Sequence, residues 1–169
     1  MALAASGVLS TMTARGKKLL GQCTAWQSWT GDPADETAAT LHIAEYEKEW
    51  TAAQVDAGRD VRAMLKIENP HPVHNTNVWG CTYVYHFEAP VSSDYATDPE
   101  QAFREFQNNL GATLDEMRGD ALADTTGLLP AIRPDEMTID GPYETPETEL
   151  QTDDHMIWAD VKIPAGPRG

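Results

Sequence analysis

Residues 78–87 read Val-Trp-Gly-Cys-Thr-Tyr-Val-Tyr-His-Phe, and this stretch decides the fold. Large aromatic residues recur at every second position in its second half, and the other face, with Val78, Thr82, Val84 and His86, is also fairly apolar. A period of two is typical of a β-strand, and a strand with two apolar faces belongs in the interior of a sheet. The stretch therefore predicts a central strand, which ends at Ala89-Pro90.

Three other segments predict the neighbours of this strand. Residues 61–67 and 155–163 alternate between apolar and mainly polar positions, which is typical of half-buried strands. A short strand is expected at 137–139. Residues 69–77 are rich in Pro, His and Asn and predict a loop, whereas the acidic stretch 140–154 predicts an exposed hairpin loop or arm.

The clearest helix signal begins at Asp98. Asp98 suits the N-cap, Pro99 suits the first helical position, and Gln101 completes an arrangement like a capping box. The apolar residues that follow step by three and four, as one face of a helix requires: Phe103, Phe106, Leu110, Leu114, Met117 and Ala121. Gly127 and Pro130 lie beyond the expected end of this helix.

The first fifty residues contain one more expected helix and two less regular segments. Residues 6–23 place apolar side chains near one helical face, although three glycines weaken the helix. Residues 26–36, which include Gly-Asp-Pro, predict a loop. Residues 37–50 fit either a helix or a strand, and a strand over 40–46 is favoured.

These elements predict an α+β fold. We expect a mostly antiparallel or mixed sheet of at least four strands, covered on one side by two helices. The length of 169 residues fits a single domain, expected over 1–164, with a loose C-terminal tail at 165–169.

The charge balance excludes several classes of function. The chain carries 27 acidic and 12 basic residues, for a formal net charge of −15. Binding to nucleic acid depends on Lys and Arg that displace counterions, so this surface predicts no specific nucleic-acid binding. It also predicts weak attraction to anionic membranes. No targeting or membrane-spanning pattern is seen, so we expect a protein that folds in a cytoplasm, with Cys23 and Cys81 reduced and buried or half-buried.

The residues that could carry chemistry show no motif. His71-Pro72-Val73-His74 offers two possible ligands but lacks the companion residues of a zinc motif, and the remaining histidines lie on expected strands, at His42, His86 and His155. Nucleophile elbows, thiol-protease signatures and phosphate-binding loops are missing from the sequence. The sequence therefore predicts no enzyme, with no catalytic residues, no cofactor and no metal.

The order of these features resembles one family, the tail terminator proteins of long-tailed bacteriophages, also called head–tail joining or tail completion proteins. The resemblance lies in an N-terminal helix that runs into Trp26-Gln-Ser-Trp29-Thr-Gly, then the strand 61–67 and the aromatic strand 79–87. The helix started by Asp98-Pro99 and a closing strand pair follow. The resemblance covers roughly residues 5–164.

The resemblance implies a homo-oligomer, a ring of six copies on the last ring of the tail tube. Such a ring stops tube growth and offers a docking surface to the neck protein below the capsid. The partners implied are the tail tube protein and the head-closure protein, and DNA passes through the ring without specific binding. The implied location is the virion, after synthesis in the cytoplasm of the bacterial host, and the family has no catalytic residues to carry over.

Ring closure requires two different patches of each subunit to meet. The acidic arm 140–154 and the loops around Trp29 and His71 are the segments expected to reach a neighbour. The candidate inter-subunit contacts are Trp26, Trp29, His71, His74, Tyr143, Glu144, Glu147 and Glu149.

Other functions stay open from the sequence. The chain could be another neck or tail component, such as a head-closure protein, an adaptor or a tube subunit. An acidic cellular binding module of the inhibitor or immunity type is a further alternative. An enzyme whose site forms only in three dimensions is the third, and it requires a pocket with convergent titratable groups.

Overall fold

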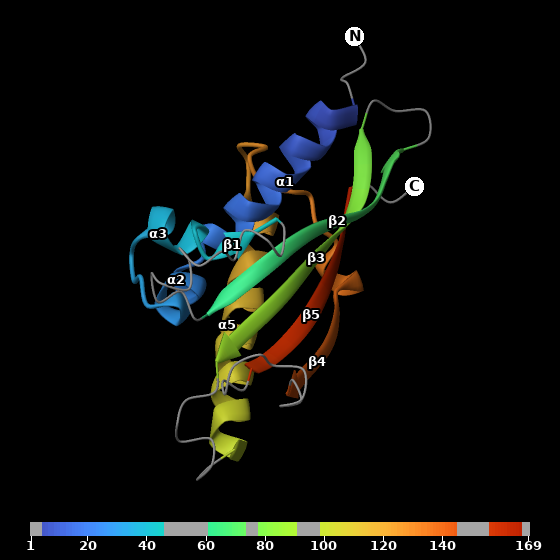
Figure 1. The fold of residues 1–169 in the computed structure, drawn as a ribbon. Helices are drawn as coiled ribbons and strands as arrows, with labels where there is room; N and C mark the ends of the chain where they lie inside the picture. Colours follow the sequence, from blue (N-terminus) through green and yellow to red (C-terminus); the bar gives the residue numbers. More distant parts are fainter. Residues whose placement is uncertain (1–4, 46–60, 74–77, 91–98, 145–155, 167–169) are drawn as a thin grey trace.

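The structure, a computed structural model, describes residues 5–45, 61–73, 78–90, 99–144 and 156–166. It is an α+β fold in which the described strands form a five-stranded mixed sheet in the order β1-β2-β3-β5-β4 (Figure 1). The elements in chain order are α1 (Ala5–Gly21), α2 (Thr24–Thr30), α3 (Glu36–Thr40), β1 (Ile43–Ala44), β2 (Arg62–Pro72), β3 (Trp79–Pro90), α5 (Pro99–Ala123), the 3₁₀ turn η3 (Pro134–Glu136), β4 (Thr138–Glu144) and β5 (Met156–Ala165).

The aromatic strand β3 is central, as the sequence predicts. It pairs antiparallel with β2 on one side and with β5 on the other, and β1 joins the outer edge of β2 in parallel. One face of the sheet is the buried face, and the side chains that it contributes to the core include Leu65, Tyr83, Tyr85, Phe87, Val161 and Ile163.

The helices cover this buried face (Figure 1). α1 packs on β2, and α5 contacts α1, α2 and the edge strand β4. Four residues spaced by four, four and three along α5 are buried: Phe106, Leu110, Leu114 and Met117. The long helix thus presents the apolar stripe that its sequence predicts. None of the helices in the described part of the chain is long and apolar enough to span a membrane.

α1 lies very close to the sheet at Gly16. A Cβ atom added there would stand 2.7 Å from a ring carbon of Tyr83 and 2.8 Å from Leu65. Two tyrosines of β3 complete this contact, because the buried hydroxyl of Tyr83 donates to the carbonyl of Met12 at 3.0 Å and that of Tyr85 to the carbonyl of Gly16 at 2.8 Å. The absence of a side chain at Gly16 therefore lets the helix meet the tyrosines of the central strand.

A cluster of aromatic rings joins α2 to the core. Trp26 is fully buried, its indole N–H donates to the carbonyl of Ala39 at 3.1 Å, and its ring meets that of Phe87 edge-on. Trp29 stacks on Phe87 and meets Phe106 of α5 edge-on at 5.3 Å between ring centroids. Both tryptophans therefore hold α2 between the sheet and α5.

Two described segments, one ending at residue 45 and the other beginning at residue 61, pair side by side although fifteen residues separate them. β1 pairs with the start of β2, and His42 lies beside it with only 4% of its surface exposed. One ring nitrogen of His42 bonds the carbonyl of Val61 at 2.6 Å, and the other bonds a carboxylate oxygen of Asp32 at 2.9 Å. The start of β2 is thereby fixed to the end of the helical region.

Several expected boundaries were wrong. The expected loop 26–36 contains most of α2, because Trp26 and Trp29 gain burial on a helix. The expected strand 40–46 is reduced to the two residues of β1, preceded by α3. β4 continues through Glu144 into the expected arm, and β5 includes Ala165, the first residue of the expected tail. Residues 46–50 and 145–154 lie outside the described residues.

Two glycines of α1 give a matched pair of substitutions. Replacing Gly16 with Ala should lower the free energy of unfolding by about 1–3 kcal/mol, because the new methyl group overlaps Tyr83 and Leu65. Replacing Gly7, which has no atom within 4 Å of an added Cβ, should leave stability unchanged or raise it by up to about 1 kcal/mol through helix propensity. Urea unfolding of both variants measures the difference, and equal stability of the two would contradict the close contact.

Candidate functional site

The face of the sheet opposite the helices, here called the open face, carries a row of charged side chains across three strands. His86 of β3 stands at its centre, with one ring nitrogen 2.6 Å from a carboxylate oxygen of Asp160 on β5 and the other 2.8 Å from Glu88. Glu88 also accepts a hydrogen bond from the guanidinium of Arg62 on β2 at 3.1 Å. The cross-strand register brings these groups together, since Arg62 lies opposite Glu88 and His86 opposite Asp160.

The electrostatics of this row favour a charged histidine. Burial alone would lower the pKa of His86, but its hydrogen bonds to Glu88 and Asp160 and their negative charge outweigh burial and raise it. Burial would raise the pKa of Glu88, but His86 and Arg62 outweigh that effect and lower it. A ring with both nitrogens bonded to carboxylates donates from both as an imidazolium. It then has no free nitrogen with which to accept a proton from a substrate.

Aromatic side chains flank the charged row. Trp158 stacks on the ring of His86 at 5.4 Å between centroids and contacts Tyr143 of the edge strand β4 at 4.9 Å. The hydroxyl of Tyr143 donates to a carboxylate oxygen of Asp140 at 2.5 Å. Among the described residues of the open face, the charged groups therefore pair with one another beneath or beside aromatic rings, an arrangement that stabilises strand pairing.

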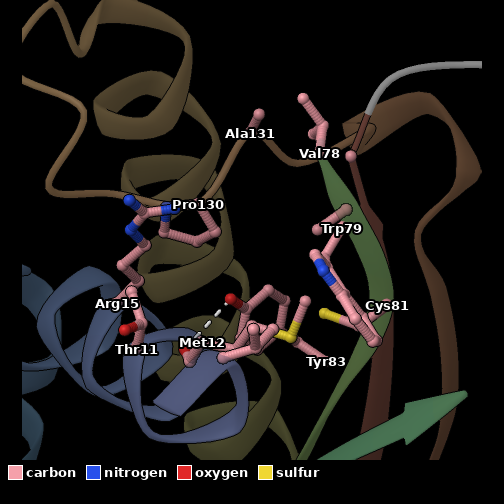
Figure 2. A pocket seen from close by; sticks show the side chains of 12 residues that line it. Thr11, Met12, Arg15, Val78, Trp79, Cys81, Tyr83, Pro130 and Ala131 are labelled. Carbon is pink, nitrogen blue, oxygen red and sulfur yellow. Dashed lines mark hydrogen bonds between the residues drawn. The ribbon is translucent and has the colours of Figure 1, made fainter. Parts of the chain in front are cut away.

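A pocket of about 350 Å³ opens at one end of the molecule, and it is called here the end pocket (Figure 2). Its walls come from the first half of α1, the start of β3, the turn before η3 and the end of β5. The residues that line it are Val8, Thr11, Met12, Arg15, Val78, Trp79, Cys81, Tyr83, Pro130, Ala131, Ala165 and Gly166. Among these described residues Arg15 carries the only charge, and its side chain is exposed.

The polar groups inside the end pocket are poorly suited to catalysis. The hydroxyl of Tyr83 is committed to the carbonyl of Met12, and burial raises its pKa. Burial raises the pKa of the Cys81 thiol to about 11, so the thiolate that a nucleophile requires is rare at neutral pH. Cys23, the second free cysteine, is also buried, and burial raises its pKa further. The expectation of two buried cysteines is confirmed.

Metal binding finds no support in the described residues, where no group of three or more His, Cys, Asp or Glu side chains could hold an ion. His42 and His86 are hydrogen-bonded within the structure, as their positions in the sequence suggest. His71 packs over Gly80 with one nitrogen bonded to the carbonyl of Asn69. His74 and His155 lie outside the described residues.

The candidate inter-subunit contacts differ in how exposed they are in the structure. Trp26 is enclosed by the chain's own core, so the prediction that it contacts a neighbour is wrong, and Trp29 is partly buried in the same cluster. His71 is exposed near the end of β2, and Tyr143, which is 47% exposed, lies beside Glu144 at the end of β4. Glu147 and Glu149, like His74, are outside the described residues.

Sequence reasoning missed both features of this site. The residues of the charged row alternate with the core positions of their strands. The period of two therefore predicts that they face away from the core, but it does not predict that they contact one another. The end pocket joins four segments that are distant in the sequence, and only the strand register could have indicated it.

The comparisons with known proteins give no relative: no family model, no curated protein and no solved structure matches this chain. The function is therefore argued from the site and from the fold.

The charged row predicts a pH dependence of stability. Because the pKa of His86 is raised in the folded state, its contribution is full below the unfolded pKa of about 6.5 and is lost as the pH rises through the folded pKa. The difference in unfolding free energy between the wild type and His86→Gln should therefore shrink from pH 6 to pH 9. Urea unfolding at several pH values measures it, and a difference that grew with pH would contradict a charged His86.

Proposed function

We propose that this chain is a structural subunit of a long-tailed bacteriophage, a tail terminator that closes into a ring at the head-proximal end of the tail tube. The observation that carries the proposal is the order and pairing of the elements. An N-terminal helix, an antiparallel strand pair, a long helix started by proline and a closing strand pair build one sheet with helices on a single face. The resemblance to tail terminators rests on the same order.

The chemistry of the surface supports a scaffold over an enzyme. On the open face, His86, Glu88, Asp160 and Arg62 bond one another and leave no free base. The end pocket holds a committed tyrosine hydroxyl and a thiol with a raised pKa. Catalytic sites instead bring a nucleophile, a base and an oriented partner to one point in a cleft. The polar groups of the described surface are arranged to hold strands together.

The shape and the charge suit a ring around DNA. The two ends of the sheet present different groups, the end pocket at one end and the β4–β5 edge with Tyr143 at the other, and different patches are what a cyclic contact joins. A net charge of −15 per copy repels a passing duplex, so DNA would slide through without a specific grip. The ring would contact the tail tube protein on one side and the head-closure protein of the neck on the other.

A monomeric binding module is the second candidate, and the end pocket favours it. A volume of about 350 Å³ with mainly apolar walls lies at the small end of the range of small-ligand sites. Such a module would remain a single 18.5 kDa chain at every concentration and in the presence of tail tubes.

The ring is tested with tail tubes assembled from the tube protein encoded in the same genome. Six copies of an 18.5 kDa chain, about 110 kDa, should form on the tube ends and stop further growth, which cryo-electron microscopy and tube lengths with and without the protein would reveal. Terminators can be monomers until they meet a tail, so a monomer in solution alone is compatible with the proposal. Tubes that grow to the same lengths with bare ends would contradict it.

A further inference from the structure

The end pocket has the chemistry of a receptor for an aliphatic side chain beside a carboxylate. Its floor is apolar and buried: Val8, Met12, Cys81, Tyr83 and Ala165 each expose less than a tenth of their surface. Arg15 stands at its edge on α1, on the side opposite Val78 and Trp79 (Figure 2). Since no carboxylate is among the described residues that line the pocket, an arriving acid would find an uncompensated cation.

The acidic arm of this chain carries the matching groups. Residues 145–155 read Thr-Pro-Glu-Thr-Glu-Leu-Gln-Thr-Asp-Asp-His, with four carboxylates and no Lys or Arg. Leu150 is the one aliphatic side chain in this stretch, and Glu149 precedes it directly. A leucine next to a carboxylate is the pair that an apolar cavity with an arginine at its edge would select.

The arm cannot fill the pocket of its own chain. It joins Glu144, the last residue of β4, to Met156, the first residue of β5, whereas Ala165, which lines the pocket, is the last residue of β5. Nine residues of strand separate Met156 from Ala165, which is about 30 Å. Leu150 is six residues from each anchor, so a fully extended chain carries its Cα at most about 20 Å.

We propose that Leu150 of one copy enters the end pocket of the next copy, with Glu149 paired to Arg15 at its edge. The inference rests on the proposed ring and specifies how its subunits join. Because donor and receptor lie at opposite ends of the sheet, each copy gives one arm and receives another. The contact is therefore head-to-tail, the type that closes a ring.

Cysteine cross-linking tests the contact even where no ring closes. Chains with Gln151→Cys, which keep Leu150 and Glu149, are mixed with differently tagged chains that carry Thr11→Cys, which places a thiol on an exposed wall of the pocket. The matched control is Thr138→Cys, an exposed threonine on the edge strand β4. Mild oxidation should give about tenfold or more of the mixed disulfide with Thr11→Cys, because docking raises the local thiol concentration. Equal yields with the two partners would overturn the proposal.

Charge reversal tests the pairing in the assembled ring. Arg15→Glu alone and Glu149→Arg alone should each prevent ring formation, and a 1:1 mixture should restore it, since copies that alternate around an even-numbered ring meet only opposite charges. Arg104→Glu on α5, a reversal at an exposed arginine outside the pocket, should leave the ring intact. Circular dichroism checks that each variant is folded.

The outcomes separate the two proposals. Rings that form normally with Arg15→Glu and with Glu149→Arg overturn this contact and leave the terminator function standing. Selective cross-linking without rings on tail tubes supports the contact and counts against the terminator function. If the wild type forms rings but the 1:1 mixture of Arg15→Glu and Glu149→Arg chains does not, the pairing of Glu149 with Arg15 is also overturned.

Discussion

The fold depends on the close approach of α1 to the central strand. At Gly16 the helix has no side chain, and the ring of Tyr83 occupies the space that a Cβ would need. The hydroxyls of Tyr83 and Tyr85 then bond two carbonyls of α1, so large aromatic rings are buried without leaving their polar ends unpaired. This contact fixes the position of α1 on the sheet, and with it one wall of the end pocket, which the first half of the same helix supplies.

Much of the fold could be predicted because local patterns and tertiary packing agree. The alternation in 78–87 gave the central strand, and the stripe from Phe103 to Ala121 gave the long helix, since each places its apolar side chains in one direction. The region after α1 could not be predicted. Trp26 and Trp29 lie on the short helix α2, which ends with Gly31 at its C-cap, and their burial against Phe87 depends on a strand far away in the sequence.

The candidate site was harder to predict than the fold. His86 could be assigned to a strand, but its partners Asp160 and Arg62 are set by the register of β5 and β2, which sequence patterning alone does not give. The same register explains the structural role of His86. Its two carboxylate partners, Glu88 and Asp160, are themselves strand residues, so their hydrogen bonds to the histidine help to hold β3 and β5 together. The proposed tail-terminator function rests on the order of the elements and not on these residues.

The clamp around His42 has a consequence for insertions into the chain. Its ring ties Val61 to Asp32, and β1 pairs in parallel with the start of β2, so two independent contacts hold the start of β2. A segment inserted between positions 45 and 61 would leave both contacts in place, because their residues lie outside the insertion. Doubling the length of a flexible loop costs in general only about 0.6 kcal/mol in closure entropy. An insertion between positions 45 and 61 is therefore expected to cost little stability and to leave the geometry of the sheet unchanged.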